Sequence, residues 1–150
     1  MARTFYTNSS EETIDLGRSL GCLLHGGEVL AMIGELAAGK TTMTRGIAQG
    51  MGLEDDIHSP TFTLIHEHTG QCNLYHIDLY RLETQTEIES LGLEDYIYSK
   101  GVAVIEWADR LYDDLPDESI IITLTAETPD RRKIVFETNS LRLQKALEDL

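Results

Sequence analysis

One short stretch constrains the fold of this chain more than any other: GELAAGKTT, residues 34–42. It matches the pattern of a phosphate-binding loop, in which a glycine, four further residues and then Gly-Lys-Thr connect a strand to a helix. The preceding run EVLAMI (28–33) is apolar in the manner of a buried strand, and residues 41–49 fit a helix. Because the motif stands between a strand and a helix, it predicts a nucleotide site and not a plain glycine-rich turn.

The residues of this loop have distinct predicted roles. Backbone N–H groups from Glu35 to Thr41 would face the β-phosphate, Lys40 would bridge the β- and γ-phosphates, and the Thr41 hydroxyl would bind Mg²⁺. The full set of predicted loop contacts is Gly34, Glu35, Leu36, Ala37, Ala38, Gly39, Lys40, Thr41 and Thr42. The expected cofactors are therefore ATP or ADP and Mg²⁺.

A magnesium-dependent ATPase also needs carboxylates beside the loop, where sheet strands end. Asp78 ends the alternating run NLYHIDL (73–79), and Glu106 directly follows the apolar run VAVI (102–105). Asp78 could hold the metal through its water shell, unless it is a solvent-facing strand residue. Glu106 could polarise the attacking water or complete the metal shell. The predicted catalytic residues are Glu106, Asp78 and Lys40, and the predicted metal ligands are Thr41, Asp78 and Glu106.

Two further residues near these motifs have both a functional and a structural interpretation. Thr61 lies in HSPTF (58–62), a rigid connector on which a threonine could sense the γ-phosphate or Mg²⁺ as a switch. It could equally start a strand after an ordinary turn. Trp107 follows Glu106 and is either part of the site or a partly buried packing residue. Both are included among the predicted nucleotide contacts.

The histidines and arginines give weaker evidence for a binding site than the motifs above. His66, His68 and His76 could lie close together, but residues on an exposed face explain the pattern, and no cysteine pair or helical H-x-x-x-H supports a zinc site. Arg131 or Arg132 could reach the nucleotide base or a partner. Neither group changes the prediction of a nucleotide site.

The rest of the chain predicts the surrounding fold. Ser9-Ser10-Glu11-Glu12 has the pattern of a capping box at the start of a helix that ends by Gly26-Gly27. Residues 61–68 and 73–79 alternate around a turn at Thr69-Gly70, which predicts an antiparallel hairpin. Further strands are expected at 102–105, 119–125 and 132–137, and helices at 83–91, 93–99 and 140–150. The predicted fold class is α/β: a single P-loop NTPase-type domain over residues 1–150, three-layered, with a mixed, partly antiparallel sheet.

Composition and charge narrow the possible partners. With 26 acidic and 12 basic residues the formal net charge is −14, which disfavours direct binding to a nucleic-acid backbone and favours a basic protein partner or simple solubility. No apolar run is long enough to span a membrane, and the N-terminus lacks the apolar core of a signal peptide. Cys22 and Cys72 are expected to be free thiols. These features predict a cytoplasmic protein without membrane contact.

Four motifs together resemble one family: GELAAGKTT, HSPTFTL, YHIDLYRL and VIEWADRL. Their order and spacing are similar to those of TsaE (YjeE), the bacterial ATPase needed to form threonylcarbamoyladenosine in tRNA, over nearly the whole chain. The resemblance implies ATP and Mg²⁺ binding, weak hydrolysis, and a complex with the TsaD–TsaB pair in which ATP use resets the machinery. It also implies the site roles: Lys40 for phosphate, Thr41 for magnesium, Thr61 in the switch motif, Asp78 as metal-shell acid, and Glu106 with Trp107 on the catalytic side.

The chain departs from the family pattern at Ala37, where glycine is usual. If the backbone needs a positive φ there, alanine costs about 1 kcal/mol. We expect Ala37 to weaken nucleotide affinity only mildly, and an Ala37→Gly variant that bound ATP a hundredfold tighter would contradict this.

Two other functions fit the sequence less well. A small-molecule kinase usually brings several arginines to the transferred phosphoryl group, and here only Arg81, Arg110 and the Arg131-Arg132 pair are suggestive. A phosphorylated acceptor in place of free phosphate would identify it. A nucleotide-sensing module without hydrolysis would release no phosphate even with its partners, and would tolerate Glu106→Ala.

Overall fold

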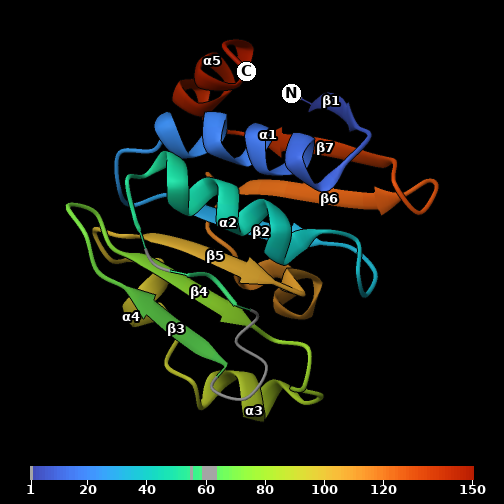
Figure 1. Ribbon diagram of the computed structural model, residues 1–150. Coiled ribbons are helices and arrows are strands. Elements are labelled where there is room, and N and C mark those ends of the chain that lie inside the picture. The colour runs from blue at the N-terminus through green and yellow to red at the C-terminus, as the bar shows by residue number, and fades with distance from the viewer. Residues whose placement is uncertain (1, 55, 59–63) are drawn as a thin grey trace.

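This computed structural model describes residues 2–54, 56–58 and 64–150 of the chain. These residues contain a seven-stranded sheet (Figure 1). Its strands are β1 (Ala2–Thr7), β2 (Val29–Ile33), β3 (Ile65–His68), β4 (Leu74–Asp78), β5 (Val102–Glu106), β6 (Ile120–Ala126) and β7 (Arg132–Thr138). The helices are α1 (Ser10–Cys22), α2 (Lys40–Gly50), α3 (Gln85–Glu89), α4 (Glu94–Ile97), the 3₁₀ helix η1 (Ala108–Asp114) and α5 (Leu141–Glu148).

The sheet is mixed, as predicted, and its order is β1-β7-β6-β2-β5-β4-β3. The four inner strands β6, β2, β5 and β4 are parallel neighbours, whereas β3, β7 and β1 are added antiparallel at the two sides. The carboxyl ends of parallel strands meet at one edge of a sheet, and ligands of open α/β folds bind there. The loop 34–39 and the ends of β4, β5 and β6 all reach this edge.

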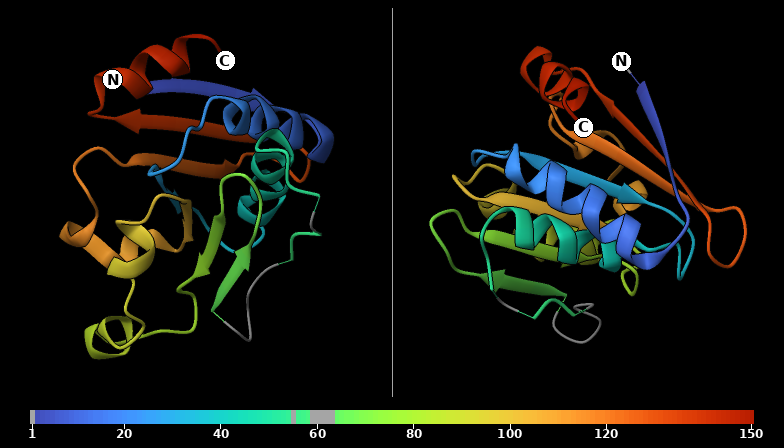
Figure 2. Two further views of the ribbon diagram at one scale, coloured as in Figure 1. Left: turned by 90° about the vertical axis from the view of Figure 1, so that its left-hand side faces the viewer. Right: turned by 45° about the horizontal axis from the view of Figure 1, so that its top comes forward.

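Helices cover the two faces of the sheet, so the predicted three layers are confirmed (Figure 2). On one face, Met43 and Ile47 of α2 and Leu20 of α1 pack against side chains of the inner strands such as Met32 and Val104. The opposite face carries α3, α4 and η1, whose apolar residues pack on the alternate residues of the same strands. The core strands are therefore covered on both sides, which explains their nearly continuous apolar sequences.

Helix α1 begins at the predicted capping box. The Ser9 hydroxyl accepts a hydrogen bond from the N–H of Glu12 (3.1 Å), and the Glu12 carboxylate accepts one from the N–H of Asn8 (3.1 Å). Glycines let α1 approach α2 closely: a Cβ at Gly46 would lie 2.1 Å from the carbonyl oxygen of Ile14. The capping box thus fixes where α1 starts, and the glycines hold it against the helix that follows the phosphate loop.

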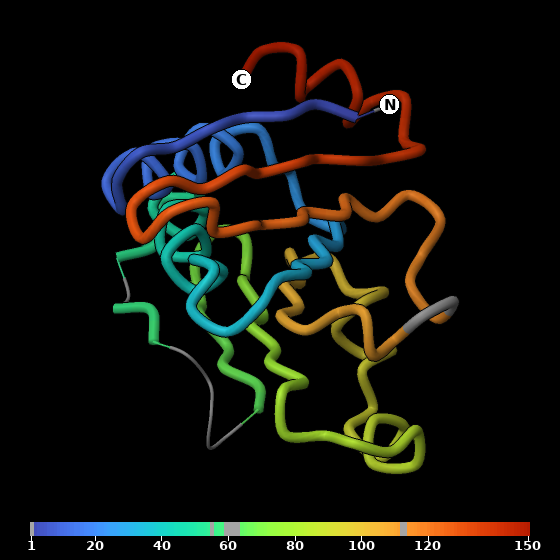
Figure 3. Tube along the Cα trace, turned by 90° about the vertical axis from the view of Figure 1, so that its right-hand side faces the viewer, coloured from blue at the N-terminus to red at the C-terminus, as the bar shows by residue number. Residues whose placement is uncertain are grey.

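Two elements were not predicted. β1 pairs with β7, which lies 125 residues or more away in the sequence, and Figure 3 shows the two running side by side. β1 is an edge strand of six residues, and it is defined by its pairing with β7. η1 follows Trp107, whose positive φ of 60° turns the chain sharply out of β5.

The helices near 83–99 are shorter than predicted. α3 covers Gln85–Glu89 and α4 only Glu94–Ile97, and Gly92, at φ 66°, lies between them. Among the described residues, no helix has the length and apolarity to cross a bilayer.

Candidate nucleotide-binding site

The loop between β2 and α2 has the backbone of an anion site. Ala37 and Gly39 adopt positive φ values of 64° and 103°, and between them the N–H of Ala38 donates to the carbonyl of Glu35 (3.1 Å). α2 then starts at Lys40 with no side-chain cap and no acidic residue in its first turn. The unpaired N–H groups and the positive end of the helix dipole at this terminus are suited to bind phosphate.

Lys40 is buried at the centre of this loop. Its Nζ donates to the carbonyls of Gly34 (2.5 Å) and Glu35 (3.0 Å) and lies 4.1 Å from the centroid of the Trp107 ring. Burial lowers the pKa of Lys40, and the negative charges of Glu106 and Asp78 oppose this shift. The side chain is thus a cation held in a partly dry site, where its attraction to a phosphate is stronger than in water.

Glu106 connects the loop to the sheet. The Thr41 hydroxyl donates to the Glu106 carboxylate, 2.9 Å from Oε2 and 3.2 Å from Oε1. Oε2 also forms a hydrogen bond with Nε2 of His76, and both His76 and Glu106 are buried. Within the described residues, Nδ1 of His76 is buried without a hydrogen-bond partner. The geometry fixes one carboxylate oxygen between a hydroxyl and an imidazole.

Asp78 stands directly beside Glu106, since the two residues are register partners on β4 and β5. Its Oδ1 accepts a hydrogen bond from the N–H of Tyr80 (2.9 Å), and the residue is only 6% exposed. The solvent-facing interpretation of Asp78 is therefore excluded. Two carboxylates and the Thr41 hydroxyl are the oxygen donors that Mg²⁺ prefers.

These donors fit Mg²⁺ that is shared with a nucleotide, and not a protein-only metal centre. No group of three or more His, Cys, Asp or Glu side chains in the described part of the chain could hold a metal ion. Mg²⁺ usually keeps several waters and takes only one or two carboxylates together with substrate phosphates. The residues at this edge of the sheet match that pattern.

Trp107 forms part of both the core and the site. Its ring contacts that of Tyr80 (centroids 5.0 Å apart), and Lys40 lies over its face. A residue other than glycine at φ 60° is uncommon, and such conformations concentrate at functional sites. The packing interpretation of Trp107 is therefore confirmed, and its role in nucleotide binding stays a prediction.

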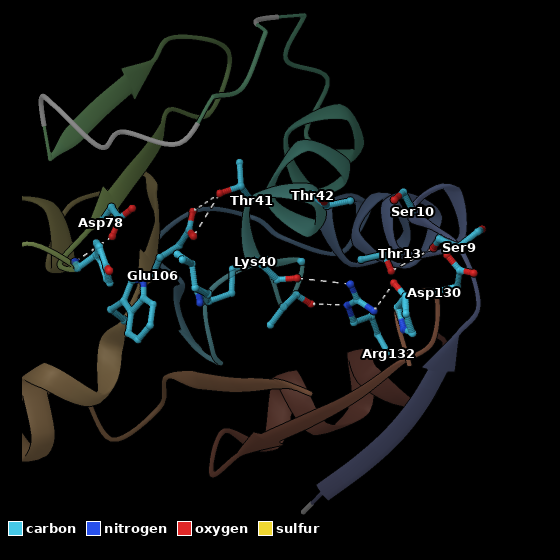
Figure 4. Close-up of a pocket in the computed structure, with 17 residues that line it drawn as sticks. Ser9, Ser10, Thr13, Lys40, Thr41, Thr42, Asp78, Glu106, Asp130 and Arg132 are labelled. Atoms are coloured by element: carbon cyan, nitrogen blue, oxygen red, sulfur yellow. Dashed lines mark hydrogen bonds between the residues drawn. The ribbon is translucent and has the colours of Figure 1, made fainter. Parts of the chain in front are cut away.

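A cavity of about 460 Å³ joins these groups (Figure 4). Of the predicted contacts, it is lined by Leu36, Ala37, Ala38, Gly39, Lys40, Thr41, Thr42, Asp78, Glu106 and Trp107. Gly34 and Glu35 do not line it; their carbonyls instead bind Lys40. Thr61 lies outside the described residues, so its predicted switch role stays a prediction.

Apart from Arg132, which the sequence suggested as a possible contact of the nucleotide base or a partner, the far end of the cavity was not predicted. It is formed by the start of α1 and the β6–β7 turn, with the lining residues Ser9, Ser10, Thr13, Pro129, Asp130 and Arg132. Sequence patterns mark the other residues only as a helix cap and a turn. Their place in a site depends on the pairing of distant strands, which no local pattern shows.

The histidines are arranged differently from the expectation. The interpretation as exposed-face residues is wrong for His68 and His76, which are 8% and 0% exposed. His66 and His68 have ring centroids 6.1 Å apart, whereas His76 is bound to Glu106. The signal for His76 was its spacing two residues before Asp78 on the same strand, which places both on one face.

Comparisons with known proteins show which family the chain resembles. Residues 7–134 match the model of the family described as threonylcarbamoyl adenosine biosynthesis protein TsaE. The Bacillus subtilis protein of that name is 38% identical over 145 residues, 96% of this chain and 90% of its own length. The Treponema pallidum protein is 38% identical over 85% of this chain and 95% of its own length.

A crystal structure of Bacillus subtilis YdiB has the same fold. It matches with a TM-score of 0.85 and 32% sequence identity, covering 99% of this chain and 93% of that one. Likeness of sequence along most of the chain and likeness of fold thus point to the same relatives. The chain belongs to the TsaE family of tRNA threonylcarbamoyladenosine biosynthesis proteins.

Proposed function

We propose that this protein binds ATP with Mg²⁺ and hydrolyses it slowly, as an energy-coupling subunit in the threonylcarbamoyl modification of tRNA adenosine. The observation that carries the proposal is the hydrogen bond from Thr41, at the start of the phosphate-loop helix, to Glu106, which is paired in register with Asp78. Phosphate-binding backbone, a metal-binding hydroxyl and two carboxylates thus meet in one cavity. These are recurring parts of phosphoryl-transfer sites in P-loop proteins.

The phosphates would replace the internal partners of the loop. Lys40 now donates to the carbonyls of Gly34 and Glu35, and bound β- and γ-phosphates would take over part of its hydrogen bonding. Thr41 and Asp78 would hold Mg²⁺, which when bound offsets phosphate charge. Glu106 is the best-placed group to orient an attacking water, because His76 and Thr41 fix its carboxylate.

The nucleoside would extend to the far end of the cavity. Asp78 and Glu106 lie on one side of the phosphate loop and the β6–β7 turn lies on the other, since β5 and β6 flank β2. With the γ-phosphate near the carboxylates, the ribose and base would point toward Asp130 and the hydroxyls of Ser9 and Ser10. These polar groups offer acceptors and donors for the nucleoside.

The expected partner is a TsaD–TsaB-type complex in the cytoplasm. The family name gives the pathway, and the net charge of −14 favours a protein partner over direct tRNA binding. Leu36 and Tyr80 line the cavity and are 69% and 43% exposed, so a partner could contact the nucleotide-binding edge through them.

No observation favours the kinase alternative. Among the described residues that line the cavity, Arg132 is the one arginine, and its guanidinium is bound to backbone carbonyls. A kinase would need arginines directed to the transferred group. The non-hydrolytic sensor differs from the proposal in the role of Glu106.

One assay tests the proposal. The purified protein, with and without a TsaD–TsaB pair, would be assayed for phosphate release and for multiple turnover of tRNA modification. We expect both activities with the partners, and loss of both in Glu106→Gln. Retention of both activities in Lys40→Ala and Asp78→Ala would refute the proposed mechanism, and no phosphate release with partners present would favour the sensor.

A further inference from the structure

Arg132, the first residue of β7, connects the phosphate loop to the β6–β7 turn. Its Nε donates to the carbonyl of Ala38 (3.0 Å), and one terminal nitrogen lies 3.4 Å from the carbonyl oxygen of Ala37. The other terminal nitrogen donates to the carbonyls of Thr128 (3.0 Å) and Pro129 (3.1 Å) in the turn. One guanidinium thus spans two loops that are far apart in the sequence.

The contacts to the phosphate loop occur at its most constrained position. Ala37 has a φ of 64°, a conformation that is unfavourable for alanine. A loop of this type binds phosphate through N–H groups that face the ligand, so the carbonyls of Ala37 and Ala38 must point away from it. A cation that binds the carbonyls of Ala37 and Ala38 at the far end of the cavity favours this orientation before any nucleotide arrives.

Arg131 is a natural contrast, because it is the neighbouring residue and has the same side chain. It pairs with Glu127 (2.9 Å) and lies over the ring of Tyr6 (4.5 Å from the centroid). No contact of Arg131 with the phosphate loop is present in the described structure. The two arginines therefore differ in their connection to the loop and not in chemistry.

We propose that Arg132 is a positioning residue, which holds the phosphate loop in its binding-competent conformation and offsets the cost of alanine at position 37. The proposal rests on the nucleotide function for its effect on affinity, but its structural part concerns the free protein. Arg132 acts here on the loop backbone and not on the reacting phosphate. The role replaces a direct contact with the base or a partner as the principal one for this residue.

Hydrogen exchange of the nucleotide-free protein tests the structural part. Amides of residues 38–41 should exchange faster in Arg132→Gln than in the parent, while Arg131→Gln should match the parent. Equal exchange in Arg132→Gln and the parent would overturn the proposal, whether or not the protein binds ATP. Failure of the parent to bind ATP would instead overturn the proposed function and leave this measurement interpretable.

The kinetic part separates positioning from general destabilisation. Arg132→Gln should raise the KM for ATP roughly tenfold, the size expected from losing charge-assisted hydrogen bonds, with kcat at saturating ATP nearly unchanged. The same substitution in an Ala37→Gly background should raise KM by only about threefold, because glycine adopts a positive φ without the same cost. An equal rise in both backgrounds, or a fall in kcat with KM unchanged, would contradict the proposal.

Discussion

His76 and Glu106 form a buried pair on neighbouring strands, in which Nε2 of the imidazole is bonded to the carboxylate oxygen nearest the Thr41 hydroxyl. In the described part of the chain, His76 reaches the site through its hydrogen bond to Glu106 and makes none to the phosphate loop. Its effect on catalysis would pass through Glu106. Removing a residue that holds a catalytic or metal-binding side chain in place typically lowers activity by about 10- to 100-fold.

This pair predicts opposite results for two similar substitutions. The side-chain amide nitrogen of glutamine can reach the position of imidazole Nε2, whereas that of asparagine is too short. We expect His76→Gln to keep most of the ATPase kcat and His76→Asn to lose about 10- to 100-fold. Thermal unfolding of both variants would control for folding. If two well-folded variants both hydrolysed ATP at the parent rate, His76 would have no positioning role.

Asp78 predicts a change in magnesium dependence. Asp78→Asn keeps the shape but removes the charge that would support the metal's water shell. The Mg²⁺ concentration for half-maximal hydrolysis should rise about 10- to 100-fold. Asp117→Asn, at an exposed position in another loop, is the matched control and should leave it unchanged. An unaltered magnesium curve in Asp78→Asn would remove Asp78 from the metal site.

The hydrogen bonds of Glu28, at the opposite edge of the sheet, predict that its carboxyl makes the stability of the fold depend on pH. Burial raises the pKa of the Glu28 carboxyl. Hydrogen bonds from the N–H groups of His25 and Gly26 and from Arg142 lower it by more, so the pKa lies below its ordinary 4.5. A depressed pKa in the folded state means that this stabilisation is complete above pH 4.5 and is lost as the pH falls through the folded value.

The measurement for Glu28 is urea unfolding between pH 7 and pH 3. Glu28→Gln should be less stable at neutral pH by about 1–3 kcal/mol and should lose less stability on acidification. Glu118→Gln, an exposed substitution nearby, controls for net charge. Parallel stability curves for Glu28→Gln and the parent would show that this carboxyl does not contribute to the pH dependence.

The close packing of α1 and α2 at Gly46 predicts that one added methyl group lowers the stability of the fold. In Gly46→Ala the new Cβ would lie 2.1 Å from the carbonyl oxygen of Ile14, so α1 and α2 must separate. We expect a loss of about 1–3 kcal/mol in the free energy of unfolding. Ser19→Ala, exposed on α1, should change it by no more than about 0.5 kcal/mol. Equal stability of the two variants would mean that the helix contact is not closely packed.

Local patterns in the sequence were sufficient for most of the fold. The phosphate-loop helix, the hairpin and the central strand each have a signal within about ten residues, and the mixed sheet followed from them. β1 could not be recognised, because its pairing with β7 alone defines it as a strand. The 3₁₀ helix after Trp107 depends on a backbone turn that no composition indicates.

The residues of the site also fall into those that the sequence predicted and those that it did not. The loop residues, Asp78 and Glu106 stand where a strand ends or a motif lies, so the sequence placed them beside one another correctly. His76 was interpreted as one of several exposed histidines, because nothing local shows that its ring is buried against Glu106. Arg132 and Asp130 reach the cavity through a turn whose position is set by the whole sheet.

The central claim is that the loop around Lys40 binds ATP with Mg²⁺, and calorimetric titration of the parent and Lys40→Ala tests it most directly. We predict one ATP bound per parent chain and an affinity at least about tenfold weaker in Lys40→Ala, which loses a charge-assisted bond to phosphate. Arg131→Ala should titrate like the parent. Absence of ATP binding by the parent, or equal affinity in Lys40→Ala, would contradict the account.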